Sequence, residues 1–262
     1  MKLKWYGTAA IMLEQDGTKL LFDPFLSRNA GAFKPPVEEL SEADGILATH
    51  GHLDHIADIP AIISRGDCRA GVFCTARPRE TLIMKGVPEA KIRTIAPGDV
   101  FVIGPFEVSV LRGKHIVNDF RLIVRTFLSP RIPRNLSSFR YLAKENRSCP
   151  EGGETVMYDI KARGARALLM GSMNLDERTE YPKGADLLVL PFQGRSDIGK
   201  CALRAIERLR PKKVLLDHFD DSFPPISSAV DVGPFVSLMQ SAHPGVPVIC
   251  PQAGAGWYPI PD

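Results

Sequence analysis

The stretch Thr49-His50-Gly51-His52-Leu53-Asp54-His55 holds three of the six histidines of the chain and one aspartate. Neutral imidazole and carboxylate groups are ligands that divalent zinc, manganese and iron accept in proteins. Gly51 has no Cβ, so the backbone can bend between two converging imidazole rings. An ordinary solvent-exposed turn has no use for three imidazoles. The stretch therefore predicts a metal site.

The residues on either side place this stretch at the end of a strand. Residues 45–49 are small or apolar and predict a buried strand, and residues 56–63 predict the beginning of a helix. In α/β folds, ligands bind outside the carboxyl ends of strands. We therefore expect the histidines on a strand-to-helix turn.

The rest of the chain alternates strands and helices in two similar halves, about 1–125 and 150–262. In the first half we expect strands at 2–13 and 18–24 around the Asp16-Gly17 turn, a loop at 26–44, strands at 71–75 and 92–95, a helix at 79–86 and a hairpin at 100–112. In the second half we expect strands at 155–160, 166–170, 187–190, 213–216 and 246–250, and helices at 200–209 and 233–241. These halves predict one domain over residues 1–262.

The composition is that of an ordinary globular protein, with 44% hydrophobic and 24% charged residues. A net charge of +3 is too small to predict a nucleic acid or an anionic membrane as partner, and no apolar run approaches the roughly 18 residues of a membrane span. The five cysteines form no C-x-x-C pair, which favours free thiols in a reducing compartment. We expect a cytoplasmic protein with a small-molecule substrate. The oligomeric state stays open, with a homo-oligomer as the expectation.

With its preceding strand, the stretch from His50 to His55 resembles the signature of the metallo-β-lactamase superfamily. The upstream residues 21–25, Leu-Phe-Asp-Pro-Phe, are similar to the segment before the metal motif in the L-ascorbate-6-phosphate lactonase branch. Residues 214–221 resemble the last metal-binding strand and loop of that branch. The resemblance implies an α/β fold, a four-layer α-β-β-α sandwich with the metal site along one edge of its two sheets.

The resemblance also assigns metal ligands to six positions of this chain. The first metal would be held by His50, His52 and His115, and the second by Asp54, His55 and His218. The sixth histidine, His243, is left as a surface residue.

One position departs from the superfamily pattern, which expects an aspartate that bridges both metals after a strand. Here residues 167–170 are followed by Gly171-Ser172-Met173-Asn174, so Ser172 stands at the place of that carboxylate. A serine hydroxyl is a poor ligand for a dication, and the loss of a negative charge between two dications weakens the pair. Three outcomes stay open: one metal at the first site, two metals bridged by water alone, or a replacement acid. The candidate acids are Asp176, Asp217 and Asp220.

Several residues near the motif are candidates for the chemistry. Asp54 is the catalytic candidate, because it could accept a proton from the attacking water and orient it. Asp23 is expected to accept the outer N–H of a ligand histidine, with a turn acid before Pro24 as the alternative. Lys114 and a basic loop at 128–153 could stabilise an oxyanion. A loop of that length is typical of a lid or binding loop, and a solvated basic loop is the alternative.

We therefore expect a hydrolase of an ester, lactone or phosphoester bond, with a substrate that is anionic if the basic residues face it. Zinc is the expected cofactor, with manganese or iron as alternatives and one or two ions bound. The alternative function is a degenerate superfamily member that binds metal or ligand without turnover. Nucleic-acid processing is disfavoured by the small net charge. A flavodiiron reductase would need an acid at the position of His52 and a flavin partner.

Overall fold

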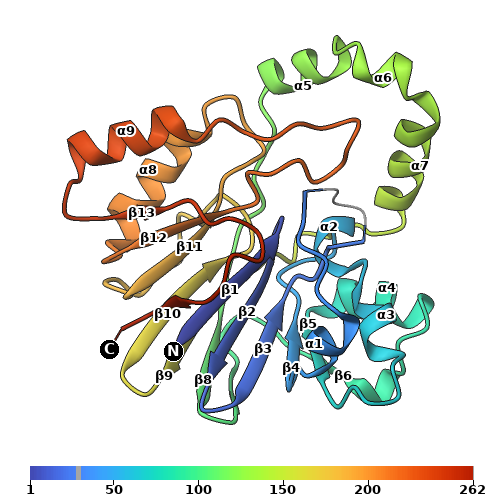
Figure 1. Ribbon diagram of the computed structural model, residues 1–262, viewed down its shortest axis with the longest axis vertical. Helices are drawn as coiled ribbons and strands as arrows, with labels where there is room; N and C mark the ends of the chain where they lie inside the picture. Colours follow the sequence, from blue (N-terminus) through green and yellow to red (C-terminus); the bar gives the residue numbers. More distant parts are fainter. Residues whose placement is uncertain (28–30, 262) are drawn as a thin grey trace.

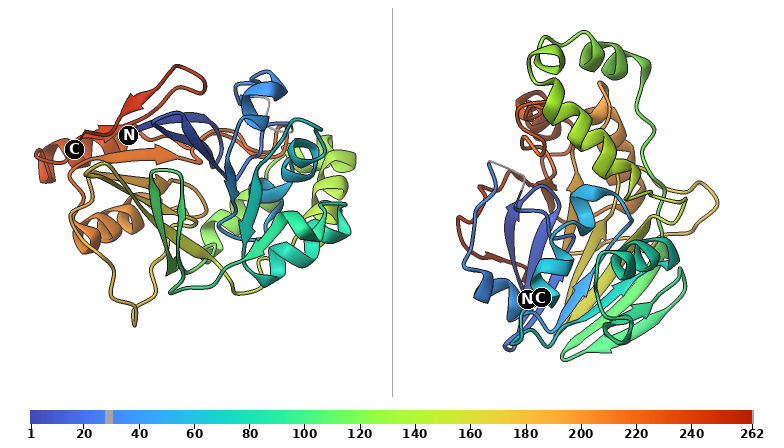
Figure 2. Two further views of the ribbon diagram at one scale, coloured as in Figure 1. Left: turned by 90° about the horizontal axis from the view of Figure 1, so that it is seen from below. Right: turned by 90° about the vertical axis from the view of Figure 1, so that its right-hand side faces the viewer.

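The computed structural model describes residues 1–27 and 31–261. Two seven-stranded sheets pack face to face, and helices cover both outer faces (Figures 1 and 2). The termini lie near each other at one edge, because the C-terminal strand β14 (Tyr258–Pro259) pairs antiparallel with β1 (Lys2–Gly7). No helix in the described ranges is long and apolar enough to cross a bilayer.

The first sheet has the order β14-β1-β2-β3-β4-β5-β6. Its further strands are β2 (Ala10–Gln15), β3 (Thr18–Phe22), β4 (Gly45–Leu47), β5 (Gly71–Cys74) and β6 (Ile92–Thr94). Strands β1 to β3 are antiparallel, and β3 to β6 are parallel. The helical segments of this half are α1 (Val37–Ser41), α2 (Leu53–Ile56), α3 (Ile59–Ile63), α4 (Ala76–Met84) and the 3-10 turn η1 (Glu89–Lys91).

The second sheet repeats this plan in the order β13-β12-β11-β10-β9-β8-β7. Its strands are β7 (Val100–Ile103), β8 (Phe106–Arg112), β9 (Val156–Ala162), β10 (Ala165–Met170), β11 (Leu187–Pro191), β12 (Val214–Asp217) and β13 (Val248–Ile249). Strands β7 to β10 are antiparallel and β10 to β13 parallel. Its helices are α8 (Ile198–Leu209) and α9 (Gly233–Ala242). The sheets divide between β6 and β7, so the 100–112 hairpin, which we expected in the first half, belongs to the second sheet.

Successive residues of the strands face opposite layers, which is the period of two that a strand imposes. Leu20 and Phe22 of β3 lie in the cluster between the sheets, whereas Leu21 lies in the cluster under α1 to α4. In β11, Val189 faces the central cluster and Leu190 faces α8 and α9. Both faces of these strands are therefore buried, and the expected four-layer α-β-β-α sandwich is confirmed.

The N-terminal elements differ from the sequence expectation in two places. The 2–13 strand is two strands, because the chain turns at Gly7 and Thr8, both with positive φ. The expected turn at Asp16-Gly17 does join β2 to β3, with φ of 52° and 82°. The 26–44 loop contains helix α1, and residues 28–30 of it lie outside the described residues.

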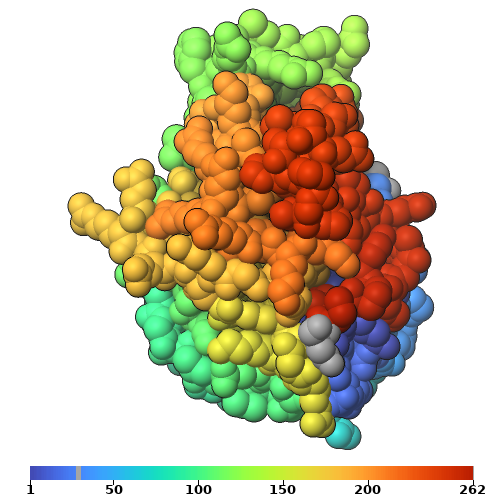
Figure 3. Space-filling model, turned by 90° about the vertical axis from the view of Figure 1, so that its left-hand side faces the viewer, coloured from blue at the N-terminus to red at the C-terminus, as the bar shows by residue number. Residues whose placement is uncertain are grey.

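The 128–153 segment is mostly helical, so the expectation of a loop is wrong. Helices α5 (Phe120–Phe127), α6 (Arg131–Arg134) and α7 (Leu136–Arg147) form an arch that rises above one edge of the sandwich (Figures 1 and 3). Pro130 and Pro133 suggested a loop, but Pro130 precedes α6 and Pro133 lies in its first turn, where a missing N–H costs little. The side chain of Asp119 caps α5 by accepting the N–H of Leu122 at 2.7 Å.

Candidate metal centre

The histidine stretch follows β4 and runs into α2, at the edge of the sandwich under the α5–α7 arch (Figure 1). The helix begins at Leu53, three residues earlier than the sequence indicated, so Asp54 and His55 lie in its first turn. A Cβ on Gly51 would lie 2.4 Å from the carbonyl oxygen of Pro150. Glycine is therefore needed here because the connection from α7 to β9 packs closely against the turn.

The first expected ligand group is brought together in space. His50, His52 and His115 each offer a ligand atom, and these atoms lie within 4.8 Å of one another. The ring of His115, which comes from the loop after β8, lies 5.1 Å from that of His50 and 4.6 Å from that of His52, centroid to centroid. Folding thus adds a third imidazole to two that are neighbours in sequence.

The second expected group lies beside the first. Asp54, His55 and His218 also offer ligand atoms within 4.8 Å of one another. His218 follows β12 in a left-handed conformation with φ of 56°, and its Nε2 lies 3.0 Å from Asp54 Oδ2. The ring centroids of His50 and His55 are 3.9 Å apart, so the two groups adjoin.

Hydrogen bonds to the outer nitrogens orient three of the rings. Nδ1 of His55 donates to Asp23 Oδ2 at 2.8 Å, and Nδ1 of His50 donates to Thr49 Oγ1 at 3.0 Å. Thr49 in turn donates its N–H and its hydroxyl to the carboxylate of Asp23, at 2.7 and 2.6 Å. Nδ1 of His115 donates to the carbonyl oxygen of Ile116 at 2.8 Å. The Nε2 atoms of these rings are left for a ligand, which is the usual arrangement around a metal.

Asp23 therefore lies where the sequence analysis expected it, against a histidine of the motif, and it is 1% exposed. Thr49 was missed as a functional residue. Its place directly before His50 was the available signal, because a hydroxyl there can reach both the ring of His50 and the acid on the neighbouring strand end.

The residues present fit a divalent cation. Nε2 of His50 and Nδ1 of His218 are buried and have no hydrogen-bond partner among the described residues, which is unusual for buried polar atoms. Burial, followed by the neighbouring imidazoles, lowers the pKa of His50 far below its usual value, and burial lowers the pKa of His52 to about 4. Both rings are thus neutral at pH 7 and offer lone pairs to a metal.

The acid of the second group is ionised. Burial would raise the pKa of Asp54, but His55 and His218 reverse this effect and lower it below the usual value. The first group therefore supplies three imidazoles, and the second supplies two imidazoles and a carboxylate.

Ser172 lies at the end of β10 and is engaged in a hydrogen bond. Its Oγ accepts the N–H of Ile116 at 3.0 Å, and Asn174 Nδ2 donates to the carbonyl oxygen of His115 at 3.3 Å. A Cβ on Gly171 would lie 2.5 Å from Cβ of Thr49, so only glycine fits beside the histidine stretch. The turn from Gly171 to Asn174 is therefore joined by two hydrogen bonds to the loop that carries His115.

The three candidate replacement acids belong to neither ligand group. Asp176 accepts the N–H of Arg178 at 2.8 Å within its own turn, and Asp220 accepts the N–H of Thr8 at 3.0 Å. Asp217 is 1% exposed, and burial raises its pKa to about 8. In the described structure none of the three acids therefore takes the place of the bridging carboxylate that Ser172 lacks.

Two further charged residues lie near the centre. Lys114 is exposed, and its charge acts on Asp176, whose pKa is lowered first by the Arg178 N–H. Glu151, which the sequence analysis did not single out, accepts the Thr155 hydroxyl at 2.6 Å. Its charge opposes the lowering of the His115 pKa by burial. Glu151 lies in the connection between α7 and β9, so this connection contributes a negative charge near His115.

Known proteins resemble this chain in sequence and in fold. The family model described as "Beta-lactamase superfamily domain" matches residues 18–219. A protein named "UPF0173 metal-dependent hydrolase" from Carboxydothermus hydrogenoformans is 29% identical over 256 residues, which are 96% of this chain and 97% of that protein. A protein of the same name from Azorhizobium caulinodans is 34% identical over 117 residues, and that match spans about half of the relative, 49%, and 44% of this chain.

Among solved structures, the chain is similar to Igni18, "a novel metallo hydrolase" from Ignicoccus hospitalis. The TM-score is 0.68 at 19% identity, with 98% of each chain covered. At this identity the similarity shows the fold.

Proposed function

The chain belongs to the β-lactamase superfamily and is a metal-dependent hydrolase, and from this premise we propose that it cleaves an ester, lactone or phosphoester bond of a small molecule. The observation that carries the proposal is the adjacency of the two ligand groups, with the rings of His50 and His55 3.9 Å apart and their outer nitrogens tied to Thr49 and Asp23. Such pre-orientation is what a metal site requires.

A bound dication would lower the pKa of water from 15.7 toward about 7 and so supply a nucleophile at neutral pH. The residues of the chain hold the geometry for this reaction. His50, His52 and His115 would hold the ion through neutral imidazoles, and zinc is the metal that such a set favours, with manganese or iron as alternatives. Asp54 is ionised, so it can accept a proton from the attacking water and orient it.

Lactones stay within the proposed substrate class because residues 21–25 are similar to the corresponding segment of the lactonase branch. The cytoplasm is the proposed location, since all five cysteines are free thiols.

The number of metals depends on Ser172. We propose that the wild type binds one ion firmly in the first group, because Ser172 supplies no negative charge between the groups and its Oγ is engaged with Ile116. Elemental analysis of protein purified under reducing conditions, with an anomalous-scattering map, should show one ion per chain at His50, His52 and His115. Ser172→Asp should retain a second ion near Asp54 and His218. Two ions in the wild type would overturn this assignment.

Turnover is tested with a generic aryl ester and a bis-aryl phosphate. We expect the metal-loaded wild type to cleave at least one of them, and His52→Ala to lose both metal and cleavage. Absence of cleavage in the wild type, together with its appearance in Ser172→Asp, would instead identify a degenerate member that binds metal without turnover. Ser172 is the observation that favours this alternative, because it stands where the superfamily pattern has an aspartate that bridges both metals.

A further inference from the structure

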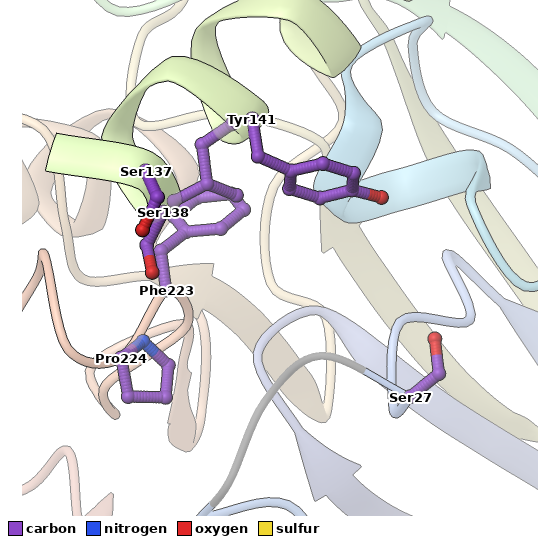
Figure 4. Close-up of a pocket in the computed structure, with 7 residues that line it drawn as sticks. Ser27, Ser137, Ser138, Tyr141, Phe223 and Pro224 are labelled. Atoms are coloured by element: carbon purple, nitrogen blue, oxygen red, sulfur yellow. The ribbon is translucent and has the colours of Figure 1, made fainter. Parts of the chain in front are cut away.

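A cavity of about 380 Å³ lies between α7 and the edge of the sandwich (Figure 4). Figure 4 shows Ser137, Ser138 and Tyr141 of α7 on one side, with Phe223 and Pro224 below them and Ser27 across the hollow. Leu142 completes the lining. The volume lies at the lower end of the range of small-molecule pockets, about 300–1,000 Å³.

Each segment that lines the cavity is continuous in the chain with a residue at the metal centre or with a residue that packs against it. Ser27 follows Asp23 by four residues, and Phe223 follows His218 by five. The ring of Phe223 packs 5.5 Å from that of Phe25, which joins these two segments. The chain after α7 continues to Pro150, whose carbonyl oxygen lies against Gly51 of the histidine stretch. The cavity and the metal centre therefore share one edge of the sandwich.

The described part of the lining carries no charged side chain. Of the seven residues that line the cavity within the described part of the chain, four carry hydroxyl groups and three are apolar. The Ser27 hydroxyl donates to the carboxylate of Asp58, which disfavours an anion beside it. The hydroxyls of Ser137 and Ser138 can hold an uncharged polar group, and Leu142 and Phe223 can contact an apolar body. The chemistry of the cavity suits a neutral organic group.

Two basic residues of α7, Arg140 and Arg147, lie on another face of the helix, whereas Lys144 follows Tyr141 by three residues and borders the lining face. Ser137, Ser138, Tyr141 and Leu142 are spaced as one face of a helix, whereas Arg140 and Arg147, seven residues apart, share a different one. Both arginines are exposed. None of the seven described lining residues is a basic residue of α7. The cavity therefore does not support the anionic substrate that we expected from the basic residues of 128–153.

We propose that this cavity binds an uncharged aryl or acyl group of the substrate, beside the bond that is hydrolysed. The inference rests on the proposed function and narrows its substrate class to small neutral esters or lactones with an apolar substituent. Helix α7 then acts as the specificity element of the site, because it supplies four of the lining residues.

The test fills the cavity with a larger side chain and measures ligand binding separately from hydrolysis. Ser138→Trp fills the hollow from α7, and Ser137→Trp does so from an exposed position that tolerates a larger side chain. Asn146→Trp is the matched control, since it adds the same indole at an exposed position of α7 outside the cavity. Zinc content and melting temperature show whether each variant keeps its fold and its metal. Binding of acetanilide, a neutral aryl amide, and of inorganic phosphate is measured by calorimetry on the zinc-loaded protein.

We expect acetanilide binding to fall at least about tenfold in the two cavity variants and to be unchanged in the control, since losing a few apolar contacts has this effect. Inorganic phosphate, which has no aryl or acyl group to place in the cavity, should bind equally in all three. For 4-nitrophenyl butyrate the cavity variants should raise KM and leave kcat unaltered. The proposal is overturned if wild type does not bind acetanilide, or if cavity and control variants bind it equally. Wild type that binds acetanilide through the cavity but cleaves no substrate would overturn the hydrolytic function and leave the cavity assignment intact.

Discussion

Ser172→Ala removes the one hydroxyl that links the Gly171–Asn174 turn to the loop carrying His115. In the wild type, Ser172 Oγ accepts the N–H of Ile116 at 3.0 Å, and the carbonyl oxygen of the same residue accepts Nδ1–H of His115 at 2.8 Å. The Ile116 residue thus couples the serine to the orientation of the ring. Alanine keeps the Cβ and changes little else, so the variant isolates this coupling.

The expected effect follows from the two bonds. A net hydrogen bond contributes about 1 kcal/mol, and a buried donor left unpaired costs about 1–3 kcal/mol. We therefore expect the free energy of unfolding of the metal-free protein to fall by about 1–2 kcal/mol. Zinc affinity of the group formed by His50, His52 and His115 should fall by about 10–100-fold, the usual effect of removing a group that orients a metal ligand.

Urea unfolding of the metal-free protein measures the first quantity, and zinc titration against a competing chelator measures the second. Ser41→Ala is the matched control, because Ser41 is also buried and its Oγ donates to the carbonyl oxygen of Glu38 at the same distance of 3.0 Å in α1. The control should lose stability and keep its zinc affinity. An unchanged zinc affinity in Ser172→Ala would refute the reasoning, since the serine would then be a stabilising residue with no influence on His115.

Three further predictions concern the surroundings of the metal centre. Asp23→Asn keeps the shape of the side chain but removes the charge that accepts Nδ1–H of His55 at 2.8 Å. In the Ser172→Asp background, which should retain the second ion, calorimetry should therefore show a second-group metal affinity about 10–100-fold lower, and an unaltered affinity would contradict the orienting role. Gly51→Ala would place a Cβ 2.4 Å from the Pro150 carbonyl oxygen and should lower the free energy of unfolding by about 1–3 kcal/mol in urea, whereas Gly66→Ala, with no atom within 4 Å, should leave it unchanged. Chelation of the metal should abolish hydrolysis and lower the melting temperature, because a ligand at 100 times its dissociation constant stabilises the folded protein by about 2.7 kcal/mol. If activity and melting temperature do not recover when zinc is added back, zinc is not the cofactor.

Local patterns were sufficient for most of the fold. The alternation of Leu20, Leu21 and Phe22 between two layers is a consequence of strand geometry, so the sequence alone predicts a strand there and a layer on each side of it. The Asp16-Gly17 turn fixes the hairpin of β2 and β3 in the same way, since both residues adopt the positive φ that such turns need. Elements with weaker local signals were missed, among them the two-residue strand β14, which exists through its pairing with β1.

The prediction of a loop at 128–153 was wrong because it took the two prolines as helix breakers without regard to their positions in the helix. Pro130 and Pro133 interrupt the apolar pattern, yet each stands where a helix tolerates it, and the 136–147 segment between Asn135 and Ser148 forms a regular helix. Which side chains of α7 face the cavity depends on where that helix lies on the sandwich, and no periodicity in 128–153 contains that information.

The sequence established that three imidazoles and an acid stand together after a strand, because their spacing is local and needs no other part of the chain. It also marked Ser172 as the departure from the family pattern. Only folding brings His115 and His218 to the same edge, because these residues stand 65 and 168 residues after His50 in the sequence. The N–H of His218 donates to the carbonyl oxygen of Thr8, a residue from the other sheet's first turn, at 2.8 Å. The physical reason is that a ligand group is a set of distances between distant residues, and those distances are fixed by the packing of two sheets rather than by the order of residues along the chain.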